Sequence, residues 1–156
     1  MNISEGMIKK SETLSRLNSL LAKSIDAKKG YHRAAEEIDD PSLKGLFMTL
    51  AEQRENFRKS TREEIRYLGG EPSSAPLDPD FIQESFAQPD LLVLLNSVEQ
   101  TLETCLKSEL NILTQYENIL ADAEGSTCNL IIGQRESVKL ALSDLKALRA
   151  SAGLTL

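Results

Sequence analysis

The chain has 156 residues, of which 40% are apolar, 27% charged and 4% aromatic, and its formal net charge is −6. This length and balance fit a single globular domain over 1–156 and argue against a disordered chain. The low aromatic content favours packed helices over a β-sandwich. The acidic charge argues against nucleic acid or an anionic membrane as a partner, because either would favour a basic surface.

The sequence also lacks the marks of export or membrane insertion. Its first 21 residues contain no apolar core of the kind found in secretory signals. The strongest apolar run, LLVLL at 91–95, is far shorter than the ~18 residues that a membrane span needs. Two cysteines, Cys105 and Cys128, make no disulfide framework. We therefore expect a cytoplasmic protein.

Two helices are predicted in the first half of the chain. Apolar residues recur at spacings of three and four over residues 12–38 and again over 41–68. Between the two, Pro41 cannot extend the first helix but suits the first turn of the second, and Asp40 can cap that turn. Gly69 and Gly70 end the second helix, since Gly readily adopts the left-handed conformation of a helix C-cap.

The second half predicts a long connection followed by another helical pair. Residues 69–89 hold four of the five prolines, and a short helix at 79–87 fits inside them. Helices follow over 90–122, with apolar residues at heptad spacing, and over 127–149. Two helical hairpins joined by one long crossover make the topology of ferritin-like bundles. We therefore predict an all-α, ferritin-like four-helix bundle.

Each predicted helix carries a polar residue on its inner stripe near the middle of the bundle. These residues are Lys28, Arg54, Glu109 and Gln134. Since an unpaired buried charge costs several kcal/mol, we expect a central polar layer in which Arg54 and Lys28 neutralise Glu109 and Gln134 completes the hydrogen bonds. Within it, we expect Arg54 and Glu109 to form an ion pair. Two alternatives are long side chains that reach solvent between the helices, and a ligand or catalytic site.

Several motifs follow one another within residues 14–148. They are Gly30-Tyr31 with Ala34-Ala35, then Asp40-Pro41, Gln53-Arg54 with Phe57, and Leu68-Gly69-Gly70. Together they resemble a bacterial family of ferritin-like bundles of unknown function. The resemblance implies the same fold and implies no function.

The dimetal chemistry of ferritin-type bundles is not expected here. Such sites use a Glu from each of two helices and a Glu-x-x-His from each of the other two. This chain has Arg54 and Phe57 in one such pattern, Gln134 and Ser137 in the other, and keeps only the carboxylate of Glu109. Two inward cations, Arg54 and Lys28, would repel metal ions, so we predict no metal, no cofactor and no catalytic residue.

Three functional hypotheses remain open at the level of sequence. The first is a non-catalytic bundle that acts through protein contacts or self-association, with a homodimer as one form. Its support is the absent metal ligands and an apolar group in the crossover that must cover a surface, formed by Phe81, Ile82 and Phe86. The second is a metal-binding or oxidoreductase bundle with unorthodox ligands. The third is a binder of a small anion held by Arg54 and Lys28.

Overall fold

The computed structural model of the chain describes residues 3–73 and 98–151. Within these ranges it contains four helices: α1 (Ile3–Glu37), α2 (Pro41–Tyr67), α5 (Val98–Leu120) and α6 (Gly125–Ser151). The prediction of an all-α bundle is confirmed. The expected short helix at 79–87, and with it Phe81, Ile82 and Phe86, lies outside the described residues.

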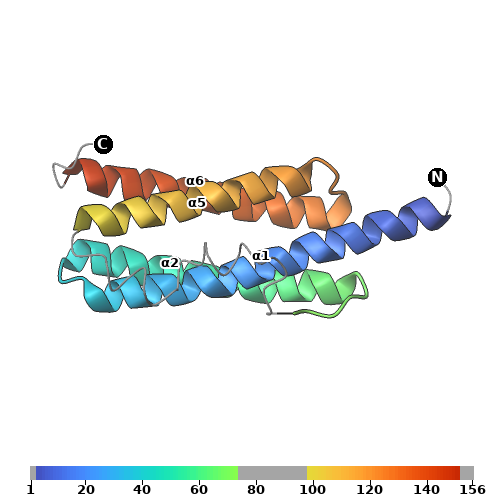
Figure 1. Cartoon of the computed structure of the whole chain (residues 1–156), viewed down its shortest axis with the longest axis horizontal. Coiled ribbons are helices and arrows are strands. Elements are labelled where there is room, and N and C mark those ends of the chain that lie inside the picture. The colour runs from blue at the N-terminus through green and yellow to red at the C-terminus, as the bar shows by residue number, and fades with distance from the viewer. Residues whose placement is uncertain (1–2, 74–97, 152–156) are drawn as a thin grey trace.

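The helices form two antiparallel hairpins that pack side by side (Figure 1). Helix α1 packs against α2 and α5, and α6 packs against α5 and α2, so that α2 and α5 face each other across the diagonal of the bundle. Figure 1 also shows that α2 and α5 run in the same direction, α2 ending at the opposite end of the bundle from the one where α5 begins. This is the predicted topology of two hairpins joined by a long crossover.

Local sequence signals set both ends of α2. The Oδ1 atom of Asp40 accepts a hydrogen bond from the backbone N–H of Leu43 at 3.0 Å, and Pro41 occupies the first turn. At the other end, Gly69 has a φ of 85°, and its N–H bonds to the carbonyl of Arg66 while that of Gly70 bonds to the carbonyl of Ile65. This pair of bonds is a Schellman C-cap.

The chain beyond α2 is fastened to α1 by one side chain. The Oδ1 atom of Asn18 accepts a hydrogen bond from the backbone N–H of Ser73 at 2.7 Å, and its Nδ2 donates to the carbonyl of Glu71 at 3.3 Å. Gly70 allows the backbone after α2 to lie close to α1, because a Cβ at this position would be only 2.6 Å from a Cδ atom of Leu14. Both ends of the first hairpin are therefore fixed by specific contacts.

Helix α1 begins earlier than the predicted residue 12. It starts at Ile3, and its first part projects past the end of α2 (Figure 1). The prediction was wrong because it placed the start at the first residues of the apolar stripe, whereas the helix begins before that stripe does. Lys9 lies in this extension and pairs with Glu124 in the turn between α5 and α6, with 2.7 Å between Nζ and Oε1. The other boundaries inside the described residues agree with prediction to within two residues.

The apolar core falls into two clusters along the bundle. One lies toward the turn at residues 38–40 and is built around Tyr31, Phe47 and Leu145. The other lies toward the turn at 121–124 and is built around Leu21, Ile131 and other residues of all four helices. Polar side chains occupy the boundary between the clusters. No helix of the described residues is long and apolar enough to cross a membrane.

Two glycines offer a matched test of the C-cap. Substitution of Gly69 by Ala should lower the free energy of unfolding by about 1–2 kcal/mol, because a Cβ is strained at positive φ. The same change at Gly133, inside α6 with open space around its Cβ position, should raise that free energy by about 0.5–1 kcal/mol. Urea denaturation of both variants measures the difference. Equal effects at the two positions would show that Gly69 has no special conformational role.

Candidate functional site

A buried ion pair lies at the centre of the bundle. Arg54 on α2 and Glu109 on α5 have side chains that are 3% and 0% exposed, and Nη2 of Arg54 donates a hydrogen bond to Oε2 of Glu109. The pair spans the diagonal of the bundle and therefore joins the two hairpins. On each helix the neighbouring core residues belong to the two apolar clusters, which meet at this pair.

A tyrosine from α1 completes the environment of the carboxylate. The hydroxyl of Tyr31 donates a hydrogen bond to Oε1 of Glu109, and the tyrosine side chain is fully buried. Burial raises the pKa of Tyr31 well above its ordinary value, and the charge of Glu109 raises it further. Tyr31 therefore stays protonated and acts as a donor. Each oxygen of Glu109 thus receives its own hydrogen bond.

The guanidinium of Arg54 is surrounded on its other sides as well. Its Nε donates to Oε1 of Gln53 at 3.2 Å, and Nε2 of Gln53 lies 3.5 Å from the backbone oxygen of Ser137 on α6. Its Cζ lies 5.8 Å from the ring centre of Tyr31 and 5.4 Å from that of Phe57, within the range of cation–π contacts. This chain of contacts, which we call the central network, touches all four helices.

The charge of Arg54 is maintained despite its burial. Desolvation is the largest single effect and acts to lower the pKa of the guanidinium. The charge and hydrogen bond of Glu109, together with the nearby Tyr31 and Tyr116, outweigh it, and the pKa of Arg54 rises above its ordinary value. Removing either charge would leave the other buried without compensation, which costs about 3–5 kcal/mol. The two residues therefore depend on each other.

A second set of polar contacts lies beside the central network in the core. The hydroxyl of Tyr116 donates to Oε1 of Gln134 at 3.0 Å, and Nε2 of Gln134 donates to the hydroxyl of Thr61 at 3.1 Å. All three side chains are buried, and burial raises the pKa of Tyr116. In the part of the chain that the structure describes, no buried side-chain nitrogen or oxygen lacks a hydrogen-bond partner. Each of these buried polar atoms thus has at least one hydrogen-bond partner.

Lys28, predicted in the central layer, lies outside it. Its side chain is 36% exposed, and its Nζ lies 2.9 Å from Oε2 of Glu55 on the flank between α1 and α2. The neighbouring residue Ala27 is buried. The heptad position of Lys28 is itself an inward one, since Leu21 and Ala35, seven residues before and after Lys28, are buried. The error arises because the long side chain of Lys28 carries its ammonium group out to Glu55 at the edge of the bundle.

The predictions for the other three residues of the polar layer were partly correct. The structure brings Arg54 and Glu109 together as expected, but Gln134 bonds to Tyr116 and Thr61 rather than to the ion pair. The contribution of the Tyr31 and Tyr116 hydroxyls to the polar interior was not predicted from the sequence. The signal that identifies them is general: a buried tyrosine hydroxyl usually needs a polar partner.

The donor set of the centre does not fit a ferritin-type dimetal site. Among the described residues, no group of three or more His, Cys, Asp or Glu side chains could hold a metal ion. Glu109 is the one buried carboxylate in the described core, and Arg54 and Tyr31 already occupy its oxygens. Cys105 lies nearby, but burial and the charge of Glu109 raise the pKa of its thiol, so that it stays protonated.

The carboxylate of Glu55 makes stability depend on pH. Hydrogen bonds from Arg58 and then from Lys28 lower its pKa from 4.5 to about 2. A depressed folded-state pKa contributes stability that is present above pH 4.5 and is lost as the pH falls from 4.5 through 2.

Substitution of Glu55 by Gln should therefore lower the free energy of unfolding at pH 7 by about 0.5–1 kcal/mol, the scale of partly exposed pairs. The difference from the unaltered protein should shrink as the pH falls from 4.5 to 2. Urea denaturation at several pH values measures it. Glu52→Gln, the same charge change at an exposed position of α2, should have little effect. A difference for Glu55 that does not vary with pH would contradict the assignment.

Solved structures share this architecture. A bacterioferritin-related protein from Bacteroides fragilis, described as a dodecameric thioferritin, is 18% identical with a TM-score of 0.79, covering 92% of this chain and 88% of that one. A ferritin-like, diiron-carboxylate protein from Bacillus anthracis str. Ames is 20% identical with a TM-score of 0.70, covering 95% of this chain and 99% of that one. At these identities the likeness shows the fold, which is the ferritin-like one. No curated protein matches the sequence.

A family model also matches, over residues 12–122, which is most of the chain. Its description is a domain of unknown function, DUF2383. The matched segment contains the whole of α2 and α5, and with them the ion pair of Arg54 and Glu109. The chain belongs to the DUF2383 family and has the ferritin-like fold.

Proposed function

We propose that this protein is a non-catalytic ferritin-like bundle that acts through protein contacts, with an arginine–glutamate pair where relatives of the fold hold metal. The observation that carries the proposal is the buried pair itself. The guanidinium of Arg54 neutralises Glu109, the one carboxylate of the described core. A dimetal centre needs several carboxylates to balance two cations, and residues 3–73 and 98–151 bring no such group together.

A binding site for a small anion has less support. Such a site needs a cation that is not already neutralised. Arg54 pairs with Glu109, and Lys28 pairs with Glu55. Both cations that were expected to hold the anion are therefore neutralised by carboxylates of the same chain. An incoming anion would have to displace Glu109 from a fully buried contact.

Self-association is the form of protein contact that the comparisons support. The B. fragilis relative of the fold is a dodecamer, which shows that this helical architecture is compatible with assembly. Most soluble oligomers are built from copies of one chain with closed symmetry. Because the buried polar side chains of the described residues have partners within the chain, we place recognition on the outer faces of the helices.

Metal analysis of untagged protein tests the proposal. We expect iron, manganese and zinc each to be far below one equivalent per chain after purification and after incubation with iron(II), and iron(II) to oxidise no faster than in buffer. The measurement is elemental mass spectrometry together with an oxidation assay. Near one equivalent of metal per chain that disappears in Glu109→Ala would contradict the proposal, because it would show that Glu109 serves as a ligand.

A further inference from the structure

The outer face of the α5–α6 hairpin carries a regular pattern of charged and apolar side chains. On α5, Glu103, Leu110 and Glu117 stand seven residues apart and therefore share one side of the helix. On α6, the residues Arg135, Leu142 and Arg149 have the same spacing.

Two ion pairs place these rows opposite each other. Arg135 lies 3.3 Å from Glu117, and Arg149 lies 3.5 Å from Glu103. The leucines in the middle of each row therefore lie at the same level. Leu142 belongs to the buried core, so Leu110, which is 53% exposed, is the leucine that this part of the surface presents. An apolar centre with charged groups on both sides is the usual organisation of a protein–protein interface.

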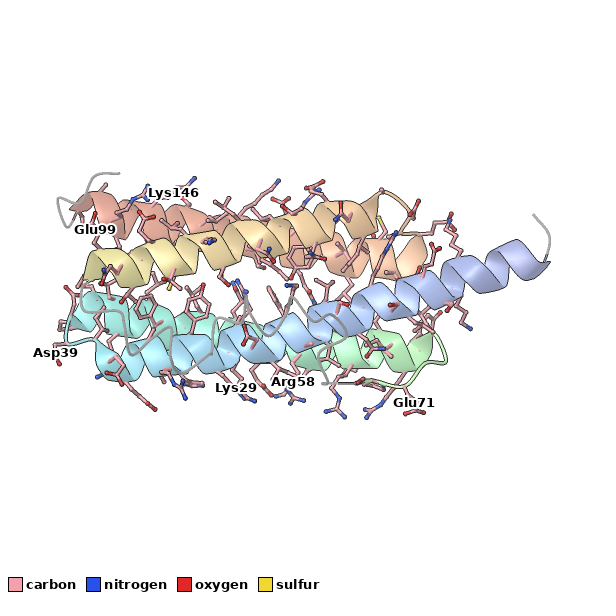
Figure 2. All side chains as sticks on the ribbon, in the orientation of Figure 1. Lys29, Asp39, Arg58, Glu71, Glu99 and Lys146 are labelled. Carbon is pink, nitrogen blue, oxygen red and sulfur yellow. The ribbon has the colours of Figure 1, made fainter. Side chains whose placement is uncertain are left out.

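More apolar and cationic groups border this centre on α6. Ile132 is 39% exposed, and Lys139 and Lys146 follow it at successive intervals of seven residues. Figure 2 shows Lys146 on the side of α6 that faces away from the α1–α2 hairpin. Glu136 lies among these cations and pairs with Arg135 and Lys139, but the four cations outnumber it, so the α6 half of the face keeps a positive net charge. The α5 half has glutamates on each side of Leu110. We call this surface, from Glu103 to Glu117 and from Ile132 to Arg149, the α5–α6 face.

We infer that the α5–α6 face binds a second copy of this chain, so that α5 of one copy lies against α6 of the other. A twofold axis parallel to the helices produces this arrangement, and it brings the glutamates of α5 to the lysines of the partner's α6 on both sides. A twofold axis perpendicular to the helices would instead place α5 on α5 and oppose like charges. The inference rests on the proposed function, and it specifies the surface through which the chain would associate with itself.

The size of the face suits a dimer. Helix α5 has 23 residues, which at 1.5 Å per residue gives a length of about 35 Å. Two helices side by side are roughly 20 Å wide, so the face offers about 700 Å² per copy. Stable interfaces bury about 800 Å² per partner, which is close to this value.

Analytical ultracentrifugation of the full chain over a range of concentrations tests the inference with two matched variants. Leu110→Lys places a cation opposite the basic α6 of the partner. Leu140→Lys makes the same change at a leucine that is 69% exposed and lies about 200° around α6 from Leu142. We expect the unaltered protein to form dimers or an assembly of dimers. Leu110→Lys should weaken the association at least tenfold, and Leu140→Lys should leave it unchanged.

The variant Leu110→Glu tests whether α5 lies against the partner's α6 and not against its α5. A glutamate opposite the basic α6 of the partner should weaken association less than a lysine does. Circular dichroism checks that each variant is folded. A monomer at all concentrations, equal effects of Leu110→Lys and Leu140→Lys, or a stronger effect of Leu110→Glu would each overturn the inference. Failure of the proposed function would appear separately, as bound metal in the unaltered protein.

Discussion

The structure depends on one electrostatic constraint, the mutual neutralisation of Arg54 and Glu109 in a fully buried position. Neither charge could remain in the core alone, because the desolvation of a single ion costs far more than its other contacts return. Tyr31 donates to the second oxygen of Glu109, and Gln53 accepts from Nε of Arg54. Through these two residues and Ser137, the network reaches all four helices. Because the pair crosses the diagonal from α2 to α5, it fixes the position of one hairpin relative to the other. Apolar packing alone specifies this position less strictly, since similar leucines recur along every stripe.

The same constraint bears on function. In ferritin-type dimetal bundles, carboxylates and imidazoles converge on a space that the metal ions fill and neutralise. In this chain the positive charge is part of the polypeptide, since Arg54 carries it, and the rings of Tyr31 and Phe57 pack against its guanidinium. Among the described residues, the buried polar side chains therefore find their partners within the chain. We expect contacts with other molecules on the outer faces, where this chain presents the charge pattern of α5 and α6.

Much of this architecture can be read from the sequence, because its signals are local. Asp40, Pro41 and Gly69 act on the backbone within a few residues, and heptad spacing identifies the buried side of each helix. The ion pair could also be predicted, since two opposite charges at core positions of comparable depth must find each other. The rest needed three-dimensional information. Lys28 was misplaced because residue spacing fixes the side of the helix from which a side chain leaves, and not where the end of a long lysine side chain lies. The partners of Gln134 depend on the relative shift of two helices, which spacing within one helix does not contain.

The most direct test of the account is a double-mutant cycle on the buried pair, measured as the free energy of unfolding in urea. Arg54→Met and Glu109→Leu should each destabilise the protein by about 3–5 kcal/mol, because each leaves one buried charge without its partner. The double variant, with two apolar side chains of similar volume, should recover much of that loss. If the two effects simply add, then Arg54 and Glu109 do not stabilise each other, and the central network does not have the role given to it here.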